Sequence, residues 1–344
     1  MPIAFSLSSP ELAELIAPHT SRLTGLAVRV DDTRSYLNRV AKHLRHPIPT
    51  LHTFRISATI PGLQKAEFAL GVLDPFFLHS RNLVLDGITL FRRHLVVPDA
   101  LKTFPHVTEL TVHASDHVSI ELVHFLETLE QLPMLERVFI TFGGLGWSGH
   151  PRAITLPHVR EMSVLVPKPG GLVPPILRYI KFPNLMSLRL QVQLSEAPSS
   201  FPVFPTESFD EYLPNLINLP DLQAIVGETS IEVTFRNPQA AFSYVATDGF
   251  KTYHRDRLIW GALPLHTVRR LLVDIRAPCE DVDHGWFVKM LQDLPHLERV
   301  DFGGNYPATV QCLCCNVARR RLRIPIRTLV ECAAGEYETR GAQS

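Results

Sequence analysis

One pattern of hydrophobic and polar positions recurs along this 344-residue chain. An apolar residue is followed by a proline, a variable position, Leu or Val, two variable positions, and then apolar, variable, apolar. Six segments carry this pattern: IPTLHTFRI (48–56), FPHVTELTV (104–112), LPMLERVFI (132–140), LPHVREMSV (156–164), FPNLMSLRL (182–190) and LPHLERVDF (294–302). Weaker copies occur at 21–28, 80–85, 219–226, 266–273 and 324–331. Most successive copies lie 24–29 residues apart, so the chain is a series of repeats.

The end of each copy predicts a short strand with one buried face. Apolar and polar residues alternate there, and successive side chains of a strand point to opposite faces of a sheet. We expect the last two apolar positions to be buried and the residues next to them to face solvent. The positions for which we state this are Leu110, Val112, Val138, Ile140, Leu188 and Leu190.

The segments between the copies predict helices. Apolar residues recur at helical spacing in 32–46, 118–132, 174–180 and 285–294. A further helix is expected to start at Ser9, Pro10 and Glu11, which supply an N-cap, a first-turn proline and an early acid. A strand–turn–helix unit cannot bury its apolar face alone, but stacked units can.

The core of each copy, L-x-x-L-x-L at a spacing near 20–29 residues, is the signature of leucine-rich repeats. We therefore predict an α/β leucine-rich-repeat-like solenoid of about ten degenerate repeats, with a curved parallel sheet and helices on the convex side. The whole of 1–344 is expected to form one domain with insertions at about 191–218 and 227–263. Within these, the Pro- and Ser-rich stretch 195–206 is expected to be mobile, and 229–237 alternates like a strand. The tail 333–344 is expected to fray.

Gly144, Gly146 and Gly149 spell G-x-G-x-x-G directly after an apolar run. In a dinucleotide-binding enzyme a helix starts after the third glycine, and its N-terminus holds the pyrophosphate. Here a His-Pro pair follows, and the next strand pattern begins at Leu156. That leaves no room for the helix, so we interpret the glycines as a loop between repeats and predict no dinucleotide cofactor.

Other enzyme-like strings are incomplete. HRD at 254–256 lacks the Asn that a kinase catalytic loop places five residues after the Asp, and GWSG at 146–149 lacks the glycine that a nucleophile elbow places two residues after the Ser. We predict no catalytic residue. The alternative hypothesis is a hydrolase or transferase with a site in 191–263 built from His254, Asp256 or Asp248, and a third is a relic without selected function.

Metal binding is also not expected. His113 and His117 lie on a predicted strand and at a predicted helix start, and no constellation of cysteines or acids accompanies them. The cysteines of CLCC (312–315) lack a second C-x-x-C pair, and Cys often serves as a small buried hydrophobe. The arginines at 319–321 are typical of a solvated helix face.

Composition narrows the setting of the protein. Lys plus Arg and Asp plus Glu number 34 each, so no global field attracts nucleic acid or an anionic membrane. No apolar run approaches 18 residues, and the N-terminus does not look like a signal peptide. All five cysteines lie in the last fifth of the chain, which does not suggest a disulfide framework. We expect an intracellular monomer, in cytoplasm or nucleus, that contacts neither nucleic acid nor membrane.

The repeats resemble the leucine-rich-repeat half of fungal F-box proteins in the six proline-containing segments, in SPELAELIAPHTSRLTGLAV (9–28), in LPLHTVRRLLV (263–273) and in LPHLERVDFGG (294–304). The resemblance covers nearly the whole chain. It implies a module that presents substrates to a ubiquitin ligase. In that family an N-terminal F-box binds the ligase adaptor, whereas here the first repeat begins near residue 21, so we expect no F-box.

We therefore predict a non-enzymatic module that binds a protein partner of unknown identity on the concave side of the sheet. Phe139 is expected to stand exposed there, between Arg137 and the acids Glu109 and Glu161, with Arg189 on the same face. An aromatic side chain beside Arg is typical of interface hot spots.

Overall fold

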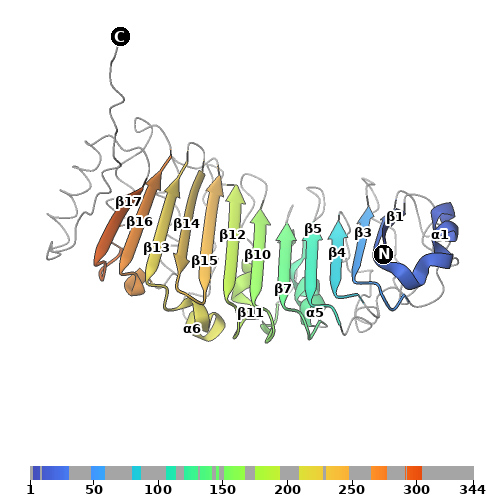
Figure 1. Ribbon diagram of the computed structural model, residues 1–344. Helices are drawn as coiled ribbons and strands as arrows, with labels where there is room; N and C mark the ends of the chain where they lie inside the picture. The colour runs from blue at the N-terminus through green and yellow to red at the C-terminus, as the bar shows by residue number, and fades with distance from the viewer. Residues whose placement is uncertain are drawn as a thin grey trace, which may run out of the picture.

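The fold is a solenoid built on one long, mostly parallel sheet, seen in a computed structural model (Figure 1). The structure describes residues 3–7, 10–30, 48–58, 80–86, 106–113, 120–130, 132–141, 145–146, 151–166, 175–193, 209–227, 230–247, 265–276, 291 and 293–303. Within them, thirteen strands pair in the order β1 (Ile3–Leu7), β2 (Leu23–Val30), β3 (Thr53–Ala58), β4 (Asn82–Asp86), β5 (Glu109–His113), β7 (Arg137–Thr141), β10 (Glu161–Val166), β12 (Ser187–Gln193), β15 (Ala241–Thr247), β14 (Ser230–Arg236), β13 (Asp221–Val226), β16 (Arg270–Ile275) and β17 (Arg299–Gly303). The predicted repeat solenoid is thereby confirmed in its general form.

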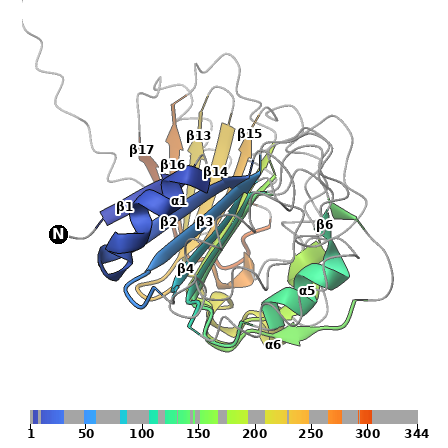
Figure 2. The ribbon, with the colours of Figure 1, turned by 90° about the vertical axis from the view of Figure 1, so that its right-hand side faces the viewer.

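Few helices accompany this sheet in the described residues. They are α1 (Pro10–Ile16), α5 (Leu122–Glu130), α6 (Phe209–Tyr212) and the 3₁₀ turns η1 (Ala17–Arg22), η3 (Pro175–Arg178), η4 (Pro214–Leu216) and η6 (Leu265–Thr267). Small strand pairs join β6 (Ile120–Glu121) to β8 (Leu145–Gly146) and β9 (Ile154–Thr155) to β11 (Ile180–Lys181). Figure 2 shows α5 and α6 together on one side of the sheet. None of the helices described has the length and hydrophobicity to cross a membrane.

The proline of the repeats occupies a tight turn that leads into each strand. In 48–51, 132–135, 182–185 and 294–297 the N–H of the last residue donates to the carbonyl of the first, over 3.0, 3.2, 3.3 and 3.3 Å. Proline suits the second position of such a turn because its ring presets φ. Both end residues of each of these turns are buried. The apolar-Pro-x-apolar motif is therefore a turn that is anchored in the core at both ends.

The core side chains of neighbouring strands lie side by side in a continuous row. Register places Leu110, Val138, Met162 and Leu188 next to one another on β5, β7, β10 and β12, and each is at most 2% exposed. The six positions predicted to be buried, Leu110, Val112, Val138, Ile140, Leu188 and Leu190, are all buried. The predicted assignment of inner and outer faces is confirmed at these positions.

The predicted helices are confirmed only in part. The one expected at 118–132 is shorter, because 120–121 pair as β6 with β8 before α5 begins. The segment 174–180 forms the 3₁₀ turn η3, since only a few residues separate the prolines at its start from β11. The helix expected near Pro10 is present as α1. The stretch 32–46 and most of 285–294 lie outside the described residues, as do 195–206 and 333–344.

The stretch 227–263, expected as an insertion, supplies two strands of the main sheet in its described part. The strand predicted at 229–237 is confirmed as β14, but it runs antiparallel inside the sheet. Sequence reasoning missed β15, which pairs parallel with β12. The chain passes from β12 to β13, three positions further along the sheet, and returns through β14 to β15, which fill the two positions between them. An Asn237 turn joins β14 to β15, because its Oδ1 accepts the N–H groups of Gln239 and Ala240 at 2.8 and 2.6 Å.

Candidate functional site

The outward side of the sheet, which we call the polar face, carries the side chains that alternate with the core rows. Register arranges them in rows across the strands. The Glu109 row consists of Thr53, Asn82, Glu109, Arg137, Glu161, Ser187 and Ala241. The Phe139 row consists of Arg55, Val84, Thr111, Phe139, Ser163, Arg189 and Ser243. These rows are exposed or half-buried throughout, so they form a solvent-facing surface of the solenoid.

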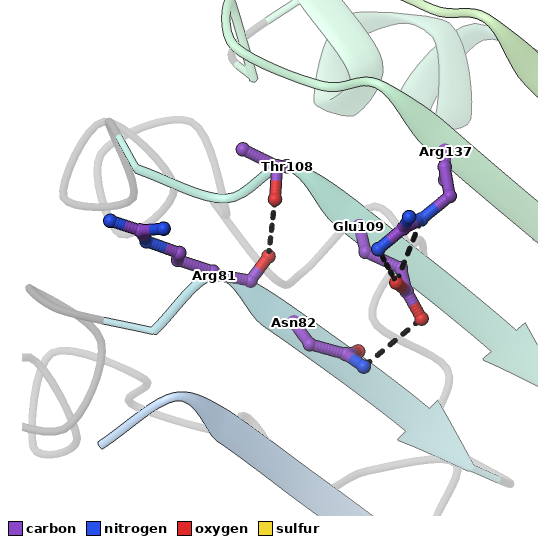
Figure 3. Close-up of polar contacts among 5 residues, drawn as sticks. All are labelled: Arg81, Asn82, Thr108, Glu109 and Arg137. Carbon is purple, nitrogen blue, oxygen red and sulfur yellow. Dashed lines mark hydrogen bonds and ion pairs between the residues drawn. The ribbon is translucent and has the colours of Figure 1, made fainter. Parts of the chain in front are cut away.

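Glu109 is held from both sides within its row (Figure 3). The Nδ2 of Asn82 donates to Oε1 of Glu109 at 3.0 Å, and Nε and Nη2 of Arg137 donate to Oε2 at 2.9 and 2.6 Å. The Glu109 side chain is only 20% exposed, against 49% for Arg137. One row before them, Thr108 Oγ1 donates to the Arg81 carbonyl at 3.5 Å. The network ties β4, β5 and β7 together and occupies the charges of Glu109 and Arg137.

The Asn82 amide also holds an unsatisfied atom. Its Oδ1 is buried and has no hydrogen-bond partner in the described part of the chain. Turning the amide over would place Oδ1 against the Glu109 carboxylate, so the bond to Glu109 determines the orientation of the group. The Nδ2 donor therefore fixes the orientation of the Asn82 amide, and the Oδ1 acceptor does not contribute to it.

Asn82→Asp should lower the free energy of unfolding by about 1–3 kcal/mol at neutral pH, because it replaces the donor to Glu109 with a second carboxylate. The loss should shrink below about pH 4, where an aspartate carboxyl protonates and regains a donor. Urea titrations at pH 7 and near pH 4 measure both values. Thr53→Ser, the adjacent residue in the row, is the control and should change stability by under about 0.5 kcal/mol. An equal loss at both pH values would contradict the role of the donor.

All five residues predicted to bind a partner lie on the polar face. Glu109, Arg137 and Glu161 are consecutive in one row, while Phe139 and Arg189 flank Ser163 in the next. Phe139 is half-buried, not exposed as expected, because β7 lies inside the sheet with β5 on one side and β10 on the other. Glu161 and Arg189 are exposed, and neither makes a side-chain hydrogen bond or ion pair with another described residue.

Charges toward the C-terminal end of the sheet pair with one another. Arg270 donates to Asp221 through two bonds, the longer of 2.8 Å, and Arg269 reaches Glu298 at 2.8 Å. Within β17, Arg299 donates to Asp301 at 2.8 Å, and after β16, Arg276 donates to Asp274 at 2.9 Å. Sequence reasoning missed the Asp221–Arg270 pair, because the two residues are 49 positions apart and meet only through the strand order.

Lys181 forms a second polar cluster away from the polar face. It lies on β11, donates to Glu211 of α6 and stands over the Tyr212 ring at 5.2 Å. The hydrogen bond to Glu211 raises the pKa of Lys181 above its usual 10.5. A raised lysine pKa contributes stability that is lost only as the pH rises through it, so this contact is constant at neutral pH. Its role is to fasten α6 to β11.

The described residues on the C-terminal side of the glycine loop form strands, and 151–166 contain no helix. Gly146 ends β8, and the described residues 151–166 form β9, a turn and β10. Gly144, Gly149, His117, Asp248, His254, Asp256, the cysteines of 312–315 and the arginines of 319–321 lie outside the described residues. His113 ends β5 with its Nδ1 3.1 Å from Thr141 Oγ1. No three His, Cys, Asp or Glu side chains gather as metal ligands in the part of the chain that the structure describes.

Comparison with known proteins adds little to this geometry. Neither a known protein family nor a curated protein matches the sequence. Among solved structures, a protein of Bacteroides fragilis aligns over 84% of this chain and 68% of its own length, with 12% identity and a TM-score of 0.35. A likeness of that size supports no statement about function, so the function has to be inferred from the residues of the polar face.

Proposed function

We propose that the protein is a non-enzymatic module that holds a protein partner on the polar face, through a central patch formed by Glu109, Arg137, Phe139, Glu161 and Arg189. One observation supports this proposal most. The charges of β13, β16 and β17 pair with one another, whereas Glu161 and Arg189 in the middle of the face have no side-chain partner among the described residues. A partner gains the most binding free energy where charged side chains lack partners beside a half-buried aromatic residue.

The resemblance to fungal F-box proteins suggests a specific form of this function. In that form about ten leucine-rich repeats, with helices on the convex side, recognise a substrate of a ubiquitin ligase in the cytoplasm or nucleus. The recurrent turn-and-strand units support the repeat architecture. The ligase role would be supported if a ubiquitin-ligase adaptor co-purified with the full chain from cells that express it natively. The same proposal includes that the protein is a monomer and binds neither nucleic acid nor membrane.

An enzyme with a site in 191–263 is the second candidate function. Its residues His254, Asp256 and Asp248 lie outside the described residues. The described part of this stretch consists of sheet strands with α6 and η4. Substitution of His254 and Asp256 by Ala separates the candidates, since an enzymatic function would be lost while partner capture would persist.

Phe139→Ala should reduce capture of the partner at least about tenfold while the melting temperature stays within a few degrees, because interface hot spots contribute roughly 2 kcal/mol or more. Quantitative mass spectrometry of co-purified proteins measures the yield. Leu272→Ala is the matched control. Leu272 of β16 is half-buried, and the register continues the Phe139 row from Ser243 through Thr234 and Gln223 to it, well outside the central patch.

The control should retain full capture. Equal capture by wild type and Phe139→Ala would refute the central patch. A large drop in melting temperature for Phe139→Ala would instead mean that the ring serves the fold. Arg137→Ala is less informative, because it also strips Glu109 of its ion pair.

A further inference from the structure

Short side chains separate the longer ones in the middle of the polar face. In the Phe139 row, Ser163 lies between Phe139 and Arg189, and in the Glu109 row Ser187 and Ala241 follow Glu161. Strands lie about 4.8 Å apart, so the backbones of β7 and β12 at Phe139 and Arg189 are about 10 Å apart. A serine reaches less far from the sheet than either neighbour. The surface over Ser163 therefore has room for one incoming side chain between a ring and a guanidinium.

The surroundings of Ser163 combine apolar surface with two opposite charges. Phe139 stands on one side, and Leu165, also half-buried, follows on the same strand and the same face. Glu161 precedes Ser163 on that face, and Arg189 is its neighbour on β12. An apolar side chain over Ser163 would thus lie against carbon atoms, with an acid two residues away on the same strand and a base on the adjacent strand.

The two charges are open to a partner for a structural reason. Arg137, the neighbour of Glu161 across the strand pair, already donates to Glu109 through two nitrogens. Arg189 has Ser163 and Ser243 as neighbours in its row, which offer no charge. Glu161 therefore lacks a base, and Arg189 lacks an acid, among the described residues.

We infer that the central patch binds an extended protein segment carrying a basic, an apolar and an acidic side chain within five consecutive residues. The base faces Glu161, the apolar side chain covers Ser163 between Phe139 and Leu165, and the acid faces Arg189. Successive same-side residues of an extended segment are about 7 Å apart, as Glu161 and Ser163 are along β10. Arg189 of β12 adjoins Ser163, so its long side chain faces the acid that follows the apolar residue. This inference rests on the proposed function and adds the chemistry of the partner.

The mixed charge of the patch disfavours a polyanion. Nucleic acids need several cations and repel carboxylates, whereas here the carboxylate of Glu161 lies diagonally across from Arg189 and Glu109 neutralises Arg137. A single arginine between serines is also a weak site for a small anion. A peptide that pairs with both Glu161 and Arg189 shields both charges from water while it buries an apolar side chain between them.

Selection of a phage-displayed library of random twelve-residue peptides on the purified full chain tests the inference. The enriched peptides should carry the base–apolar–acid combination. Glu161→Arg should lower binding of a selected peptide at least about tenfold and shift new selections toward peptides with a second acid instead of the base. Arg189→Glu should likewise lower binding at least about tenfold and shift new selections toward peptides with a second base instead of the acid. Arg236→Glu, an exposed arginine of the same face on β14, is the control and should leave the selected combination unchanged.

The outcomes separate the inference from the proposed function. Binding of the selected peptides that falls with Phe139→Ala but not with Glu161→Arg or Arg189→Glu would overturn the charge pattern while supporting a partner-binding face. Acidic peptides sensitive only to Arg189→Glu would overturn the pattern in favour of simple anion binding. No enrichment above the Phe139→Ala protein would overturn the short-segment partner. Circular-dichroism melting controls for folding, and Glu161→Gln provides a milder variant should Glu161→Arg be unstable.

Discussion

Leu188→Ala should lower the free energy of unfolding by about 2–5 kcal/mol. Leu188 is 1% exposed and lies in the core row between Met162 of β10 and Phe242 of β15, which are 2% and 1% exposed. Truncation removes buried carbon atoms and leaves a cavity between two large neighbours. Because both neighbours belong to hydrogen-bonded strands, the backbone cannot close the space.

Urea unfolding followed by circular dichroism measures this loss. Arg189→Ala is the matched control, since Arg189 is the next residue on the same strand and faces solvent. It should change stability by less than about 0.5 kcal/mol. A loss below about 0.5 kcal/mol for Leu188→Ala, or a larger loss for Arg189→Ala, would mean that the two faces of β12 are reversed.

Phe242→Ala should cost about 3–5 kcal/mol, the range for a fully buried aromatic side chain. Phe242 is 1% exposed on β15, and its ring centroid lies 5.9 Å from that of Phe235 on β14. In the register the two rings continue the core row from Leu188 to Leu222 of β13. The residue therefore joins the N-terminal strands of the sheet to β13, β16 and β17.

This second variant tests the strand order directly. If 241–247 lay outside the sheet as a surface insertion, Phe242→Ala would have a small effect. Ser243→Ala is the control on the opposite face of β15, and it should lose about 0.5–1.5 kcal/mol with the hydrogen bonds to Thr234 and Glu232. Similar losses for both variants would refute the position of β15 between β12 and β14.

Local sequence was enough to locate the repeats and their buried face. In 132–140 the proline, the two flanking leucines and the alternation after them predict the turn and β7, and the structure has both. The reason is that a proline turn and a period-two strand involve only near neighbours in the chain. The five residues of the central patch were placed on the outward face by the same alternation.

Contacts between distant segments required the tertiary structure. The alternation placed Glu109 beside Arg137 in advance. That Asn82 also bonds Glu109, so that Glu161 has no basic partner, depends on the three-dimensional arrangement of the strands. The half-burial of Phe139 likewise depends on β5 and β10 standing on both sides of it.

The repeat unit, its turn, the core rows and the outward face follow from the sequence alone, because each depends on residues a few positions apart. The entry of β14 and β15 between β12 and β13 is set by contacts between distant segments. The alternation in 229–237 shows that a strand exists but not which strand it pairs with, since many partners bury the same apolar face equally well. The choice is made by the combined fit of Phe235, Phe242 and the Asn237 turn, and it determines which charges of the polar face meet and which remain for a partner.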